Sequence, residues 1–180
     1  MMSYRLLLVF TLLCALSACS SISVDDYADK QPVFDPQVFF NGPLLASGLL
    51  KDRSGMVVRR FTADINAYWR DGVGTLEEDF VFDDGEESRR VWTLTPAADG
   101  QFIATAGDVV GEGVASVAGN AMFLDYVLRV PYGDRSIDLR IDDRMYLLGP
   151  DLLINESQMR KFGLRVGEIV LTIRRLGSAP

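Results

Sequence analysis

The sequence predicts an all-β fold, an antiparallel up-and-down β-barrel preceded by a short N-terminal helix. Three observations support this prediction: apolar and polar residues alternate along the chain, turn signals separate short apolar stretches, and no long segment has a helical period. About ten short strands at a spacing of about 8–12 residues are typical of antiparallel sandwiches and barrels. Sequential hairpins favour the barrel, because a closed sheet has no unpaired edge.

The first 31 residues indicate a segment that delivers the protein to a membrane and tethers the folded domain there. Residues 6–18 form an apolar run, shorter than the about 20 residues that a membrane-spanning helix needs, and small residues lead to Cys19. This pattern predicts a lipoprotein signal peptide over residues 1–18, with lipid attached at Cys19; an ordinary signal peptide is the alternative. Residues 19–31 are polar and predict a tether. Because Ser20 follows Cys19, the segment resembles signals for the periplasmic face of the outer membrane in Gram-negative bacteria.

The folded domain is predicted to span residues 32–180. Asp35 followed by Pro36 indicates a helix start, because proline is favoured at the first helical position. Glycine-containing turns such as Asp83-Asp84-Gly85 then separate the strands. The predicted strands cover residues 44–51, 56–69, 73–82, 87–95, 101–106, 112–117, 121–130, 136–147, 152–161 and 165–175.

Composition excludes several functions. A net charge of −7 without a basic cluster argues against nucleic-acid binding and against electrostatic adhesion to anionic lipids. The chain has no histidine, which removes histidine-dependent triads and metal sites. Cys14 would leave with the signal and Cys19 would carry lipid, so no disulfide can form. We therefore expect a protein that is not an enzyme and that holds no metal or cofactor.

Four charged residues share a strand face with apolar neighbours. Alternation places Arg59, Glu78, Arg90 and Asp143 toward the barrel interior. One interpretation is a structural network, in which the two arginines pair with the two carboxylates because unpaired buried charges are unfavourable. The other is a ligand pocket, in which Arg59 and Arg90 hold a negatively charged head group.

A set of short motifs resembles a known family. These motifs include Asp108-Val109-Val110-Gly111, Gly119-Asn120-Ala121 and Lys161-Phe162-Gly163. Together they resemble the domain-of-unknown-function 3833 family of proteobacterial lipoproteins. The resemblance implies a lipocalin-like barrel without established activity. The family-motif residues are Gly42, Asp108, Gly111, Gly119, Asn120, Asp142 and Gly163.

The function expected from these observations is non-catalytic binding of an apolar or acyl-chain ligand by a membrane-anchored barrel. The alternative is a scaffold or assembly lipoprotein with a packed barrel that binds a protein partner, and a weaker third interpretation is an enzyme acting on lipids. Interior volume separates the first two, because large inward side chains could fill the barrel completely. The candidates for such filling are Phe61, Trp69, Phe80, Phe82, Trp92 and Tyr126.

Overall fold

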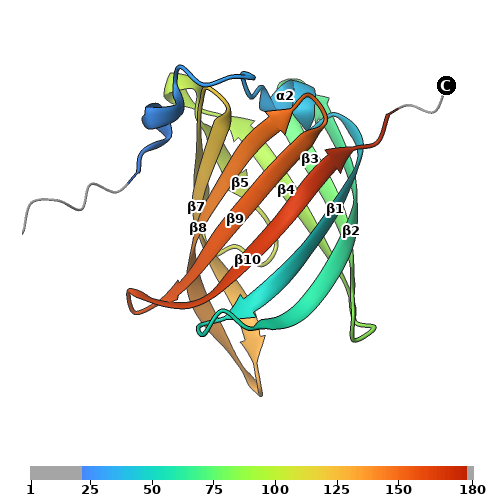
Figure 1. The fold of residues 1–180 in the computed structure, drawn as a ribbon, viewed down its shortest axis with the longest axis vertical. Coiled ribbons are helices and arrows are strands. Elements are labelled where there is room, and N and C mark those ends of the chain that lie inside the picture. Colours follow the sequence, from blue (N-terminus) through green and yellow to red (C-terminus); the bar gives the residue numbers. More distant parts are fainter. Residues whose placement is uncertain (1–21, 178–180) are drawn as a thin grey trace, which may run out of the picture.

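A computed structural model describes residues 22–177, so Cys19 and the predicted signal over residues 1–18 lie outside the described residues. Ten antiparallel strands form one closed barrel, in which each strand pairs with its neighbours in sequence and β1 pairs with β10 (Figure 1). The predicted antiparallel barrel is confirmed. The strands are β1 (Gly42–Asp52), β2 (Val57–Arg70), β3 (Val73–Phe82), β4 (Glu87–Pro96), β5 (Phe102–Thr105), β6 (Gly113–Ala118), β7 (Ala121–Tyr132), β8 (Arg135–Gly149), β9 (Leu152–Lys161) and β10 (Leu164–Arg175).

Within residues 22–177, three short helical segments accompany the barrel: η1 (Val24–Tyr27), α2 (Pro36–Phe39) and η2 (Ala98–Gly100). The helix start predicted at Asp35 is confirmed. The Asp35 side chain accepts a hydrogen bond of 2.8 Å from the Gln37 backbone N–H, and Pro36 occupies the first turn, where its missing N–H is not needed.

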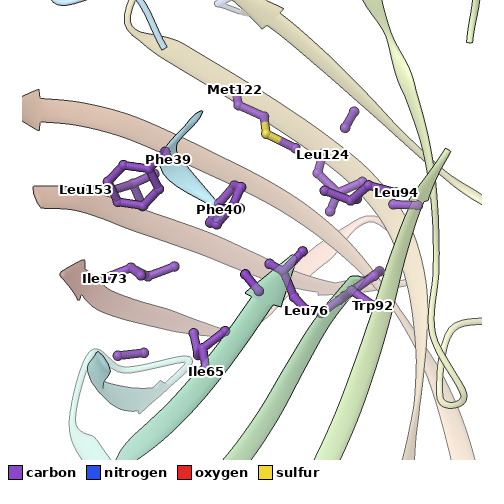
Figure 2. Close-up of a cluster of buried hydrophobic side chains, with 14 of the residues drawn as sticks. Phe39, Phe40, Ile65, Leu76, Trp92, Leu94, Met122, Leu124, Leu153 and Ile173 are labelled. Carbon is purple, nitrogen blue, oxygen red and sulfur yellow. The ribbon is translucent and has the colours of Figure 1, made fainter. Parts of the chain in front are cut away.

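Alternation along the strands builds the core. In β2, Phe61, Ala63, Ile65 and Ala67 are buried, while the residues between them are exposed. This is the pattern expected when one face of a sheet lines an interior and the other meets water. Figure 2 shows the resulting cluster of apolar side chains, contributed by strands from around the barrel.

One end of the barrel is closed by the segment that contains α2 (Figure 1). Phe34, Phe39 and Phe40 are each 2% exposed and contact one another, with ring centroids 5.2–5.8 Å apart. The Trp69 indole N–H donates a 2.8 Å hydrogen bond to the Phe40 carbonyl, which joins this segment to β2. We call it the closed end.

The opposite end is formed by the β1–β2, β3–β4, β7–β8 and β9–β10 turns (Figure 1). Inward side chains become more accessible toward these turns. In β8, Leu139, Ile141 and Leu147 are buried whereas Ile137 is partly exposed, and in β3 Leu76 is buried whereas Phe80 and Phe82 are partly exposed. We call this the open end.

The segment predicted to be a tether is packed against the barrel where the structure describes it. In η1, the Tyr27 ring lies 5.7 Å from Phe123 and 5.3 Å from Tyr146, and the Arg144 side chain donates to the Ile22 carbonyl at 3.2 Å. Within residues 19–31, the described part therefore adheres to the outside of β7 and β8.

The described core uses residues between Phe34 and Ile173. The chain from Ser20 to Pro180 therefore contains the whole barrel and its core.

Candidate functional site

The barrel encloses a cavity of about 120 Å³ beneath the closed end. Aromatic and aliphatic side chains form most of its wall, and a smaller group of polar side chains comes from β3, β4, β7, β8 and β9. The apolar lining comprises Phe40, Phe61, Leu76, Phe80, Trp92, Leu94, Met122, Leu124, Met145, Ile169, Leu171 and Ile173. The polar lining comprises Glu78, Arg90, Tyr126, Asp143, Asn155 and Ser157.

Asp143 is buried, and its carboxylate accepts hydrogen bonds from side chains of the neighbouring strand. Asn155 and Ser157, both on β9, donate hydrogen bonds to its carboxylate, the latter at 2.8 Å. These three residues are 3–8% exposed. Burial raises the pKa of Asp143 to about 6, although these hydrogen bonds act in the opposite direction.

Arg90 is held by a carboxylate from a loop. Its Nε lies 3.1 and 3.0 Å from the two oxygens of Asp108, and its Nη2 lies 2.6 Å from Oδ2. The loop that carries Asp108 is fixed to β7 by the hydrogen bond from Val110 N to Val127 O and by that from Arg129 N to Asp108 O, both 2.8 Å. The guanidinium is therefore already engaged in a bidentate pair.

Glu78 faces Arg90 across the β3–β4 pair, at the level of the cavity. It is partly buried and forms no ion pair with any residue between 22 and 177. Burial, together with the negative charges of Asp143 and Asp108, raises the pKa of Glu78 to about 7, against the opposing effect of Arg90. Burial also raises the pKa of Tyr126 well above its usual range.

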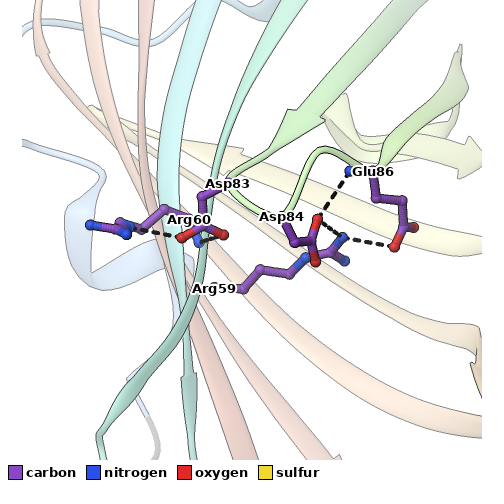
Figure 3. Close-up of polar contacts among 5 residues, drawn as sticks. All are labelled: Arg59, Arg60, Asp83, Asp84 and Glu86. Carbon is purple, nitrogen blue, oxygen red and sulfur yellow. Dashed lines mark hydrogen bonds and ion pairs between the residues drawn. The ribbon is translucent and has the colours of Figure 1, made fainter.

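The predicted pairing of Arg59 and Arg90 with Glu78 and Asp143 is wrong. Arg59 lies near the open end, outside the cavity lining, and its Nη2 contacts Asp84 at 2.8 Å and Glu86 at 2.7 Å (Figure 3). Its guanidinium carbon lies 3.6 Å from the centroid of Phe82. The physical reason is position: β2 begins at Val57, so Arg59 is close enough to the β3–β4 turn for its long side chain to reach the turn carboxylates.

The family-motif residues are spread around the barrel. Asp142 faces outward and accepts a 2.6 Å hydrogen bond from Arg160 Nε. Asn120 occupies the β6–β7 turn, where its carbonyl accepts from Leu147 N at 2.8 Å. Of the set, Asp108 alone forms an ion pair with a cavity-lining side chain among the described residues. All four glycines of this set, Gly42, Gly111, Gly119 and Gly163, have positive φ.

Sequence reasoning missed the partners of the interior charges. Asp108 lies in the loop between β5 and β6, where strand alternation makes no prediction. Asn155 and Ser157 were identifiable, because they alternate with buried Leu153 along β9 and therefore share its inward face.

The large aromatic residues do not fill the interior. Phe61, Phe80, Trp92 and Tyr126 line the cavity, whereas Trp69 and Phe82 lie outside its lining. Trp69 instead packs across β3 at Gly74, where an added Cβ would lie 2.7 Å from the indole ring. A cavity of about 120 Å³ therefore remains within the packed interior.

Residues 22–177 contain neither a membrane-spanning helix nor a metal-binding cluster. No helix in this part of the chain has the length and hydropathy to cross a bilayer. Nor does it contain a group of three or more histidine, cysteine or acidic side chains placed to bind a metal ion.

The closed antiparallel barrel with a plugged end and an internal cavity defines a lipocalin-like β-barrel protein. Residues 13–175 match the family described as a protein of unknown function, DUF3833, and the chain belongs to that family.

Two solved structures are similar in fold. The S-type phycobiliprotein lyase CPES from Guillardia theta is 11% identical with a TM-score of 0.47, over 77% of this chain and 89% of the lyase. A de novo designed fluorescence-activating β-barrel is 12% identical with a TM-score of 0.39, over 79% of this chain and 99% of the design. No curated protein matches the sequence.

Proposed function

We propose that this protein binds an apolar ligand inside its barrel, without catalysing a reaction. The observation that carries the proposal is the cavity, whose wall is mostly aromatic and aliphatic and whose few polar groups converge at one level. A concave, mostly apolar space with a small number of convergent polar groups is the usual form of a small-molecule site.

The charges at this level favour a ligand head that is cationic or donates hydrogen bonds. Arg90 is engaged by Asp108, so an anionic head would have to displace that carboxylate. Glu78, in contrast, forms no ion pair among the described residues, and its carboxylate borders the cavity. Trp92 and Tyr126 add aromatic faces, which attract cations. An acyl chain or similar tail would occupy the apolar part.

The proposed setting is the periplasmic face of the outer membrane, with the chain anchored by lipid on Cys19. The apolar run over residues 6–18, the small residues before Cys19 and the following Ser20 support this proposal. More than one acyl chain would give stable attachment. Mass spectrometry of the mature protein tests it: a diacylglyceryl group on Cys19 is the expected result, and an unmodified Cys19 contradicts it.

Ligand binding can be tested by isothermal titration calorimetry on the chain from Ser20 to Pro180. Three eight-carbon probes differ in the head group: octyltrimethylammonium, octanol and octanoate. At about pH 8, above the pKa of Glu78, we expect the cation to bind about tenfold more tightly than octanoate, with octanol between them.

Variants on β3 identify the group responsible. Glu78→Gln should remove most of the preference for the cation, whereas Glu77→Gln is the matched control, because Glu77 neighbours Glu78 in sequence but pairs with Arg89, outside the cavity lining. No binding of any probe contradicts the proposed function. Equal binding of all three probes leaves the apolar site in place and contradicts the role of Glu78.

A further inference from the structure

The open end of the barrel carries large apolar side chains that are exposed to solvent. Met56 lies between β1 and β2, Tyr132 ends β7, and Phe162 and Leu164 lie at the β9–β10 turn. Their exposed fractions are 67%, 63%, 92% and 72%, in that order. These three hairpins follow one another around the barrel, because β1 pairs with β10 and β9 pairs with β8. We call these four residues the apolar tips.

The backbone at Phe162 adopts a strained conformation. Its φ is +51°, a conformation that bulky residues rarely adopt, and Gly163 follows with φ +78°. Asparagine or glycine would suit such a turn better. The Phe162 side chain is nevertheless the most exposed of the large apolar residues described, so packing within the barrel does not account for it. Strain at an exposed position of this kind indicates a functional contact.

Basic residues flank the apolar tips, which the net charge of the whole chain does not reveal. Arg53 lies in the β1–β2 turn and Arg135 begins β8, and neither forms an ion pair within residues 22–177. The Lys161 ammonium lies 5.0 Å from the centroid of the Phe162 ring. The β3–β4 turn at the same end is acidic instead. The three adjacent hairpins also carry Asp52 and Asp134, which precede Arg53 and Arg135 in the same turns, and Asp52 accepts hydrogen bonds from Ser54 and Met56 within its own turn. The apolar side therefore carries charges of both signs, with cations in excess.

We propose that these three hairpins dock the open end onto an anionic phospholipid bilayer, and that this bilayer is not the membrane that would hold Cys19, because η1 packs beside the closed end through Tyr27 and Gly119. Phe162 and Leu164 would enter the apolar region, while Arg53 and Arg135 contact phosphate groups. Apolar side chains beside unpaired cations match an anionic membrane interface in both hydropathy and charge. Separate tips around an opening also suit a fluid layer better than the rigid surface of a folded partner. In this position the barrel opens directly onto lipid.

Vesicle flotation with the unlipidated chain from Ser20 to Pro180 tests the proposal. Vesicles of phosphatidylcholine are compared with vesicles containing equal parts of phosphatidylcholine and phosphatidylglycerol. We expect flotation with the second kind, decreasing as salt is added, because interactions of exposed charges are screened. Absence of flotation with both kinds overturns the proposal, whatever the cavity binds.

Single variants separate the apolar and the basic contributions. Phe162→Asn keeps a residue that tolerates positive φ and should weaken binding about tenfold. Leu164→Asn should weaken it similarly, whereas Leu148→Asn, at an exposed leucine near the β8–β9 turn, is the matched control and should bind normally. Arg53→Gln and Arg135→Gln should each weaken binding roughly fivefold.

The variants that lose vesicle binding show whether the apolar tips contact a membrane or a second copy of the chain. Losses limited to the apolar tips and the two arginines support membrane docking. Equal losses for Leu164→Asn and Leu148→Asn overturn it. Concentration-dependent dimers that Phe162→Asn abolishes, in the absence of vesicle binding, would assign the surface to a second copy of the chain and also overturn the proposal. The calorimetric titration of octanol checks that each variant keeps its cavity.

Discussion

At the residue scale, the interior charges show what the alternation of residues along a strand can predict and what it cannot. Inward placement was predicted correctly for Glu78, Arg90 and Asp143, which all line the cavity. Arg59 also leaves β2 on the face of buried Phe61, but its predicted partner was wrong, because its side chain reaches Asp84 and Glu86 near the open end. Strand period decides which face a side chain leaves from, but the partner of a long charged side chain depends on what lies within its reach.

Glu78 should make the stability of the barrel depend on pH. Its pKa is raised to about 7 in the folded state from an ordinary value of 4.5, so the folded state binds more protons between these values. The free energy of unfolding therefore falls as pH rises through this window. The difference in the free energy of unfolding between Glu78→Gln and wild type should therefore grow in favour of the variant, by about 2 kcal/mol, as the pH rises from about 4.5 to about 8.

Urea unfolding across this pH range measures the effect, and Glu77→Gln is the control, because Glu77 faces Arg89 on the outside. Asp143, with a pKa of about 6, contributes in the same direction in both proteins, and because its charge also acts on Glu78 the measured difference includes their mutual interaction. A constant difference between Glu78→Gln and wild type at all pH values would contradict the raised pKa of Glu78.

The two arginines should respond differently to substitution. Arg59→Met is expected to leave octanol affinity unchanged, because Arg59 lies outside the cavity lining. Arg90→Met leaves Asp108 without its partner and should reduce the free energy of unfolding by about 2 kcal/mol, somewhat less than for a fully buried pair. Calorimetric titration and urea unfolding measure the two effects. A loss of octanol binding in Arg59→Met would place that residue at the site after all.

At the element scale, turns and strands followed from local signals, whereas the docking of η1 did not. All ten predicted strands are present, because alternation and glycine turns act within a few residues. Residues 19–31 carry mostly polar side chains and no strand pattern, so they predict a tether. Only the contact of Tyr27 with Phe123 and Tyr146, on strands distant in sequence, shows that this segment packs on the barrel.

Gly119 provides a test of that docking. Both Gly119 and Gly163 have positive φ, so alanine at either position meets backbone strain of about 1 kcal/mol. An added Cβ at Gly119 would also lie 1.7 Å from the Tyr27 carbonyl oxygen, whereas one at Gly163 would meet nothing within 4 Å. Gly119→Ala should therefore release η1.

Limited proteolysis near Tyr27 reports this release, and urea unfolding compares the two variants. We expect faster cleavage in Gly119→Ala alone, with a larger loss of stability than in Gly163→Ala. Identical cleavage rates in the two variants would show that η1 accommodates the added methyl group without moving.

At the scale of the whole molecule, closure between the first and last strands removes every edge from the sheet. β10 pairs with both β1 and β9 along most of its length. A chain that ends at Lys161 would lack β10 and expose the edges of β1 and β9, and we expect it to aggregate, because unpaired strands associate. A chain that ends at Gly177 keeps β10 and its 3.0 Å hydrogen bond from Leu176 N to Pro43 O.

Soluble yield and size-exclusion chromatography compare these two truncations. The chain ending at Gly177 should elute as the untruncated protein does. A folded, soluble protein ending at Lys161 would show that an open sheet is stable here and that closure contributes little.

The sequence by itself determined the antiparallel strands, their turns, the helix start at Asp35 and the inward face of most strands. These features depend on neighbours in the chain, through turn conformation and the period of two. The tertiary structure alone decided which charges pair, that a cavity remains, and that Phe34 joins Phe39 and Phe40 in closing one end. Those outcomes depend on the shapes and distances of side chains brought together by barrel closure, and no local pattern encodes them.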